Sequence, residues 1–148
     1  MAIITSMFNQ LVDQIITEQV EPEFTSAVAV ARYRDRWLIG LSKNDDDRRG
    51  KWCHPGGHIR SGEKPAKTAT RECFEETGIR CEAIGEPFRM VSHKAIAFVP
   101  CRIVKSGQKI DVNHEFSAAG LFTMAEIRNL RPLYNNVKQL IERARKVR

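Results

Sequence analysis

Hydrophobic residues alternate with small or polar residues early in the chain, a pattern typical of β-strands. The runs Thr25–Arg34 (TSAVAVARYR) and Arg36–Ser42 (RWLIGLS) predict two neighbouring strands, with Arg34-Asp35-Arg36 as a tight reversal between them. Before these strands, apolar residues recur at helical spacing, which predicts an amphipathic N-terminal helix that runs to about Val20 and ends at Pro22. These apolar residues are Phe8, Leu11, Val12, Ile15 and Ile16.

Two later stretches carry helix signals of their own. Lys64–Thr77 has Pro65 in its first turn and Gly78 just past its end, so we predict a helix capped by a left-handed glycine. Tyr134–Lys146 is predicted to form an amphipathic closing helix. Its apolar stripe consists of Val137, Leu140, Ile141 and Ala144.

Shorter runs complete the pattern. Strand-like segments stand around Ile84 and at Phe88–Ser92 and Ala95–Val104. Another short run, Ala118–Phe122, ends at Leu121–Phe122, and Met124–Asn129 predicts a short helix. The strands and helices interleave without the regular alternation of repeated βαβ units. We therefore predict an α/β fold in which helices pack on a mixed sheet, rather than a doubly wound parallel sheet.

The composition is that of an ordinary globular domain. The 148 residues, 42% of them hydrophobic, predict one domain over residues 1–148, in which residues 1–24 form a helical extension. The net charge of +6 fits an anionic ligand but does not by itself indicate nucleic-acid binding. No apolar run approaches the ~20 residues of a membrane span and no signal peptide is visible, so we expect a cytoplasmic protein without membrane contact.

Acidic residues cluster on the predicted helix Lys64–Thr77. Glu72, Glu75 and Glu76 stand at i, i+3 and i+4 and share one arc of about 100°, beside the stripe of small residues that we expect to pack on the sheet. Like charges on adjacent turns repel, and few basic residues stand at a spacing that would pair with these acids. The pattern therefore favours a divalent-cation site over a solvated acidic face, since hard oxygen ligands suit Mg²⁺ or Mn²⁺.

A glycine pair, Gly56-Gly57, follows Pro55 ahead of this helix. Glycine permits backbone angles that other residues avoid and lets a ligand approach the main chain closely, so a carbonyl here could add a metal ligand. A plain turn at the end of a strand explains the motif equally well. For the acidic run Asp45-Asp46-Asp47, a solvated turn is favoured over a cation site.

Together these residues resemble the box of the Nudix hydrolase family, G-x5-E-x7-R-E-U-x-E-E-x-G-U, where U is a bulky aliphatic residue. The box spans residues 57–79, and the wider resemblance runs from about Thr25 to Leu130. The one departure is Cys73, which is smaller than the usual aliphatic residue and concerns helix packing rather than chemistry. Every fixed position is filled, by Gly57, Glu63, Arg71-Glu72, Glu75-Glu76, Gly78 and Ile79.

The resemblance implies an α/β/α sandwich in which the box forms a catalytic loop–helix–loop. It also implies hydrolysis of the pyrophosphate bond in a nucleoside diphosphate linked to another moiety, with Mg²⁺ as cofactor and Mn²⁺ as a substitute. Arg71 and Glu63 are implied to form a buried pair that orients the helix. The implied metal shell consists of Gly56 (through its carbonyl), Glu72, Glu75 and Glu76.

The base that deprotonates the attacking water stays open at this point. One candidate is Glu72, on the metal-facing arc. The other is Glu115, in the polar loop Asn113-His114-Glu115, where a solvated loop acid is the competing interpretation. A carboxylate bound to two cations is a poor base, so the choice depends on which glutamate binds the metal.

An alternative function from a different class is a non-catalytic Nudix-like module that binds a nucleotide or RNA. The intact box acids favour the enzyme. By elimination, the expected substrate is a small-molecule nucleotide, either a nucleoside triphosphate or a nucleotide sugar. Nucleic acid is not expected, although a capped or triphosphorylated RNA end stays open. The amphipathic segment Phe8–Ile16 could pack on a partner chain, as in a homodimer.

Overall fold

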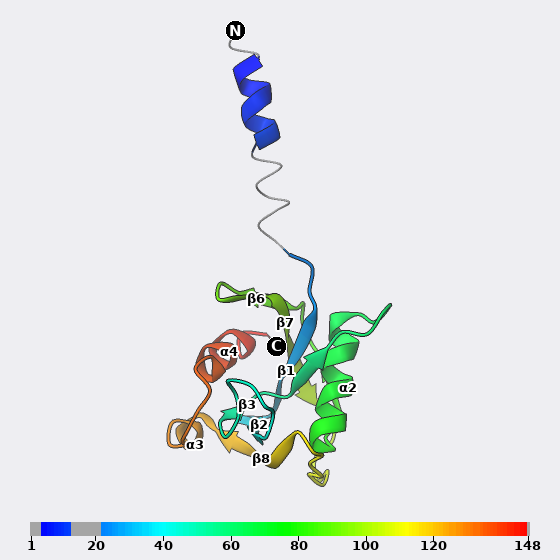
Figure 1. Cartoon of the computed structure of the whole chain (residues 1–148). Helices are drawn as coiled ribbons and strands as arrows, with labels where there is room; N and C mark the ends of the chain where they lie inside the picture. Colours follow the sequence, from blue (N-terminus) through cyan, green and yellow to red (C-terminus); the bar gives the residue numbers. More distant parts are fainter. Residues whose placement is uncertain (1–3, 13–21, 148) are drawn as a thin grey trace.

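The computed structural model describes residues 4–12 and 22–147. Residues 4–12 are helical, as predicted, whereas the predicted continuation to Val20 lies outside the described residues (Figure 1). Packing of this segment on a partner chain stays a prediction. Within the described ranges, no helix is both long and apolar enough to cross a membrane. The exposed large apolar side chains of the N-terminal segment are Ile4, Met7, Phe8 and Leu11.

The strands of the described residues form one mixed sheet. Its centre is the hairpin of β1 (Ser26–Tyr33) and β2 (Arg36–Ser42), and β1 pairs in parallel with β7 (His93–Ile103). The other pairings are antiparallel, which confirms the predicted mixed sheet. The remaining strands are β3 (Trp52–Cys53), β4 (Gly56–His58), β5 (Cys81–Ala83), β6 (Phe88–Met90) and β8 (Phe116–Thr123).

Helices cover both faces of this sheet, so the fold is an α/β/α sandwich. On one side α2 (Pro65–Thr77) lies along β1, and on the other side α4 (Val137–Ala144) packs with α3 (Met124–Ile127) nearby (Figure 1). Alternate residues of β1 serve the two cores. Ala27 and Ala29 belong to the α2 side, and Val30 belongs to the α4 side. The small alanine side chains let α2 approach the sheet closely.

The predicted elements are confirmed with small shifts at their ends. Gly78 caps α2 in the left-handed conformation, with φ of 77°, as the sequence predicts. The run predicted at Ala118–Phe122 lies within β8, which starts two residues earlier and ends one residue later because its ends also pair with β2. Strands β3 and β4 were not predicted, since two or three residues are too few to show an alternating pattern.

Candidate active site

Three carboxylates meet at the side of α2. Glu72 and Glu76 of α2 and Glu115 of the loop before β8 can each place an oxygen within 4.8 Å of the other two. Glu76 is only 1% exposed, although the sequence predicted the acids to lie off the packing face. That expectation was wrong for Glu76 because β4 and the loop before β8 cover this part of the helix.

Backbone hydrogen bonds bring Glu115 to the helix. The N–H groups of Asp111 and Asn113 donate to the carbonyls of Thr77 and Glu76, at 2.8 and 3.3 Å, which satisfies groups that the end of α2 leaves free. The Asn113 side chain then accepts from the N–H of Glu115 at 2.8 Å. Glu115 is therefore held beside α2 rather than extending freely into solvent.

Glu76 has an unusual electrostatic environment for a carboxyl group. Burial raises the pKa of Glu76 to about 10, and the neighbouring Glu115 adds to the rise. The N–H of Gly56 donates to Oε1 of Glu76 at 2.8 Å and opposes the shift. Without a cation, this carboxyl is therefore protonated at neutral pH.

Arg71 connects the box acids on the neighbouring side. Its Nε and Nη2 donate to the two carboxylate oxygens of Glu63 at 2.8 and 2.9 Å, and its Nη1 donates to Glu72 at 2.8 Å. The same nitrogen reaches Glu75 at 3.1 Å. The sequence suggested that few basic residues balance these acids. That expectation was wrong, because the guanidinium of Arg71 contacts three of them at once. Hydrogen bonds from Arg71 and then from Thr68 lower the pKa of Glu63 to about 2.

Glu75 lies outside the three-carboxylate cluster. Its side chain is 42% exposed, and it pairs with Arg71 and, at 3.8 Å, with Arg60. Its assignment as a metal ligand stays a prediction.

The glycine pair forms strand β4 rather than a turn, and neither glycine has a positive φ. Of the two properties that glycine offers, the freedom of backbone angles is not used here and the constraint is space. A Cβ on Gly56 would lie 2.6 Å from the carbonyl oxygen of Ala27, and one on Gly57 would lie 2.5 Å from Cδ of Glu72. At Gly56 only glycine fits against the backbone of β1, whereas at Gly57 a side chain would displace the carboxylate of Glu72.

The donor set fits a hard divalent cation. Carboxylate oxygens are the ligands that Mg²⁺ and Mn²⁺ prefer, and a cation among three carboxylates would offset the cost of burying Glu76 in ionised form. The residues placed to hold one are Glu72, Glu76 and Glu115, with Gly56 next to them through its bond to Glu76.

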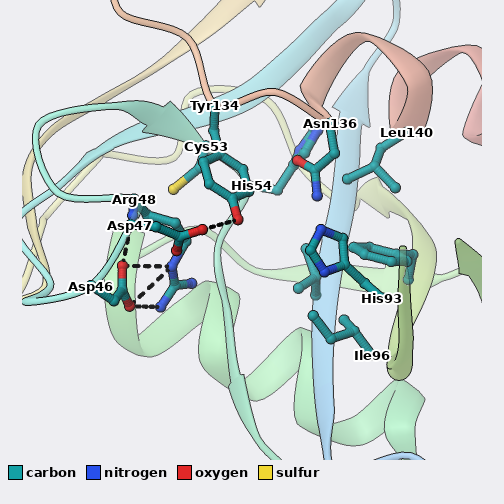
Figure 2. A pocket seen from close by; sticks show the side chains of 12 residues that line it. Asp46, Asp47, Arg48, Cys53, His54, His93, Ile96, Tyr134, Asn136 and Leu140 are labelled. Atoms are coloured by element: carbon teal, nitrogen blue, oxygen red, sulfur yellow. Dashed lines mark hydrogen bonds and ion pairs between the residues drawn. The ribbon is translucent and has the colours of Figure 1, made fainter. Parts of the chain in front are cut away.

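A cavity of about 370 Å³ opens between the loop before β3 and the start of α4 (Figure 2). It shares Val28, Asp46, Arg48 and Ile96 with the hollow that Gly56, Gly57 and Glu115 line, so the two adjoin. Two acids of the loop before β3 have side-chain partners at its rim. Arg48 holds Asp46 at 2.7 Å, and the hydroxyl of Tyr134 donates to Asp47 at 2.8 Å.

His54 lines this cavity and was not singled out from the sequence. Its side chain is 4% exposed, and neither ring nitrogen has a hydrogen-bond partner within the described part of the chain. Burial lowers the pKa of His54 to about 4; the nearby backbone of Val137 opposes this shift but does not meet the geometry of a hydrogen bond. A lone histidine before Pro-Gly-Gly gives no periodic signal, so only the fold reveals it.

Solved structures share this architecture. A NUDIX-family hydrolase of Clostridium perfringens superposes with a TM-score of 0.68 at 14% identity, over 83% of this chain and 96% of that one. An ADP-ribose pyrophosphatase of Streptococcus suis superposes with a TM-score of 0.64 at 26% identity, over 82% and 89% of the two chains.

Sequence comparison gives a short match to one curated relative and a match of a family model to most of the chain. The RNA pyrophosphohydrolase of Bartonella tribocorum is 49% identical over 45 residues, which are 30% of this chain and 26% of the relative. The match thus spans about a quarter of the length of that curated relative. The family model described as the NUDIX domain matches residues 23–144, which is most of the described chain. This chain therefore belongs to the NUDIX domain family.

Proposed function

We propose that this protein is a divalent-metal-dependent pyrophosphohydrolase that acts on a nucleoside diphosphate linked to another moiety. The observation that carries the proposal is the convergence of Glu72, Glu76 and Glu115 next to a cavity large enough for a nucleotide group. Carboxylates repel a pyrophosphate, so this arrangement suits such a substrate only when cations lie between them.

Glu72 and Glu76, with the carbonyl of Gly56, would hold Mg²⁺, or Mn²⁺ in its place; Glu75 is retained as a further ligand. When bound, the metal neutralises charge on the pyrophosphate and lowers the pKa of the attacking water. Arg71 and Glu63 act as positioning residues. Their bidentate pair joins the loop after β4 to α2, and Nη1 of Arg71 also fixes the carboxylate of Glu72.

The general base is Glu72 or Glu115. The fold holds both beside Glu76, so either can face a water at the cluster. The pH–rate profiles of Glu115→Gln and Glu72→Gln, together with the Mg²⁺ affinity of each variant, separate them. The base is the residue whose loss removes the acidic limb of the profile while metal affinity stays normal. An unchanged rate and profile in Glu115→Gln would make Glu115 a bystander.

For the substrate, we propose a nucleoside triphosphate or a nucleotide sugar. The similarity to an ADP-ribose pyrophosphatase supports the second class, because ADP-ribose is a nucleoside diphosphate joined to a sugar. The short match to an RNA pyrophosphohydrolase and the net charge of +6 keep a triphosphorylated RNA end as the second candidate.

The test is a hydrolysis screen over nucleoside triphosphates, nucleotide sugars, ADP-ribose and 5′-triphosphorylated RNA, with the products identified. We expect turnover of at least one of these compounds with Mg²⁺ and none with excess chelator. Glu86→Gln, an exposed acid outside the cluster, is the matched control for every glutamate variant. Nucleotide binding without turnover of any compound would instead favour the non-catalytic module.

A further inference from the structure

The N-terminal helix of the described chain, residues 4–12, has one apolar face that lies in solvent. At about 100° per residue, its four large apolar side chains fall within an arc of about 100°. Their exposed fractions are 71% for Ile4, 64% for Met7, 63% for Phe8 and 55% for Leu11. A contiguous apolar stripe of this kind, unlike single scattered residues, is typical of a helix that docks on a second surface.

Charge distinguishes this N-terminal segment from the rest of the protein. Residues 1–24 contain no lysine or arginine, and their net charge of −4 comes from four acids: Asp13, Glu18, Glu21 and Glu23. The rest of the chain has all 24 basic residues and the remaining 14 acids, which gives a net charge of +10. The surface that complements the segment is therefore apolar and basic, whereas an anionic lipid surface would repel it.

An exposed apolar patch with basic residues lies where α2 ends. Phe74 is 40% exposed and Val104 is 52% exposed, and Arg80 contacts both. The guanidinium of Arg80 lies 4.2 Å from the centre of the Phe74 ring, and its carbonyl accepts from the N–H of Val104 at 3.4 Å. The side chain of Gln108 holds this group in place, since it accepts from the N–H of Arg80 at 2.8 Å and donates to the carbonyls of Arg80 and Lys105. The basic apolar patch, as we call it, consists of Phe74, Arg80, Val104 and Lys105.

The charge around the basic apolar patch is positive. Lys105 and Lys109 are exposed in the segment after β7, and Asp111 is the nearby acid of the same segment. Glu75, the neighbour of Phe74 on α2, already has arginine partners. The patch therefore complements the N-terminal segment in both apolar character and charge.

We propose that the N-terminal helix of one copy docks on the basic apolar patch of a second copy, so that two chains form a reciprocal dimer. Every copy carries both surfaces, and a twofold arrangement covers both pairs of surfaces at once. This interface adds to the proposed function and does not depend on it.

The position of the patch favours a second copy over the chain's own patch. The N-terminal segment joins the sheet at Thr25, whose N–H donates to the carbonyl of Ala95, near the start of β7, at 2.8 Å. Val104 follows the other end of β7, nine residues after Ala95, which corresponds to about 30 Å along a strand. The described residues of the helix span only about 14 Å. Both surfaces are exposed in the single chain, so a second copy is the occupant to test.

Sedimentation of the full chain over a range of protein concentrations tests the proposal. We expect the wild type to dimerise, with a dissociation constant that rises at least about tenfold between low and high salt, because opposite charges face each other. Leu11→Lys and Val104→Glu each place a charge in an apolar contact, so each should raise the dissociation constant at least about tenfold. Thermal unfolding shows that each variant is folded.

Two control variants introduce the same charges at other exposed positions. Asn9→Lys changes the opposite side of the same helix. Val91→Glu changes the other exposed large apolar side chain of the described residues, in the turn between β6 and β7. Both should leave the dissociation constant within about threefold of the wild-type value.

A mixture of the two disruptive variants shows which surfaces meet. A mixed pair keeps one intact contact, between the helix of the Val104→Glu chain and the patch of the Leu11→Lys chain. In its other contact the two new charges have opposite signs. We expect this pair to form at concentrations at which neither variant associates with itself.

Any of four results would overturn the proposal. A monomeric wild type would mean that the helix docks on no second copy. Loss of the dimer in Leu11→Lys alone, with Val104→Glu unaffected, would mean that the two helices pair with each other. Equal weakening by the control variants, or the absence of the mixed pair, would mean that the contact does not join these two surfaces.

Discussion

Two carboxyl groups of the same loop–helix segment, Glu63 and Glu76, lie in opposite surroundings. Glu63 accepts two hydrogen bonds from Arg71 and one from Thr68, and these lower its pKa to about 2. Glu76 is buried beside Glu72 and Glu115, and burial raises its pKa to about 10. Glu63 is balanced by a positive charge of the protein itself, the guanidinium of Arg71, and this pair joins the loop to α2. Glu76 lies among further carboxylates, and there the proposed metal ion would provide the balancing charge.

The largest effect is expected from Glu76→Gln, which removes a buried acid of the three-carboxylate cluster. We expect metal-dependent hydrolysis to fall by at least about 100-fold, since one preorganised electrostatic group in an active site is typically worth 10²–10³ in rate. The measurement is the initial rate at saturating Mg²⁺, with Glu86→Gln as control. A rate within threefold of the wild type would contradict the role of Glu76.

The glycine pair offers a contrast between chemistry and fold. In Gly57→Ala the new methyl group meets the carboxylate of Glu72, which has to move, so we expect an activity loss of about tenfold to 100-fold with little change in melting temperature. In Gly56→Ala the methyl group meets the backbone of Ala27, so the melting temperature should fall by several degrees. Activity assays and thermal unfolding check both, and equal effects of the two variants would contradict the contrast.

The ion pair of Arg71 and Glu63 can be removed by substituting either partner. Arg71→Ala and Glu63→Ala should each lower the melting temperature by several degrees, because each leaves a largely enclosed charge without its partner. The double variant should lose much less than the sum. Arg60→Ala is the control, since Arg60 is 66% exposed and 3.8 Å from Glu75, where an ion pair contributes little. Additive losses would show that Arg71 and Glu63 act separately.

The last prediction is a pH dependence of stability with opposite signs for the two acids. Glu63 has a lowered pKa in the folded state, so its contribution to stability is present above about pH 4.5 and is lost as the pH falls toward 2. Glu76 has a raised pKa, so its contribution is present below about pH 4.5 and is lost as the pH rises toward 10.

Melting temperatures of the metal-free protein check the Glu76 part of this prediction between pH 5 and 9, and the Glu63 part between pH 5 and 2. We expect the wild type to lose stability as the pH rises, and Glu76→Gln to show a shallower slope and a higher melting temperature at neutral pH. Glu75→Gln should gain nothing, because Arg71 already pairs with Glu75. Parallel slopes for the wild type and Glu76→Gln would contradict the environment assigned to Glu76.

Sequence periodicity was sufficient to predict the elements whose two faces have different surroundings. The alternation of Ala and Val in β1 follows from its place between two helical layers, and the stripe on α4 marks its buried face. The spacing of the box predicted the pairing of Arg71 with Glu63 through the family resemblance. It could not predict the burial of Glu76, which depends on contacts from Gly56 and from the loop at Asn113.

Contacts between segments far apart in the sequence account for the rest. Tyr134 donates to Asp47, and His54 faces the start of α4, but neither relation leaves a repeating pattern in the chain. The acidic run Asp45-Asp46-Asp47 was predicted as a solvated turn. The structure gives Asp46 and Asp47 partners at the rim of a cavity, because Arg48 folds back on the loop and the segment before α4 closes over it.

The parallel pairing of β1 with β7 has a consequence for how this protein is made. Ser26 finds its partner at Ile96, so the central strand has to wait for a long stretch of later chain, including all of α2, to leave the ribosome. Pairing over such a separation slows folding, because the intervening chain loses conformational freedom before the contact stabilises it. The three carboxylates therefore cannot meet until the chain as far as Glu115 has been made and has left the ribosome.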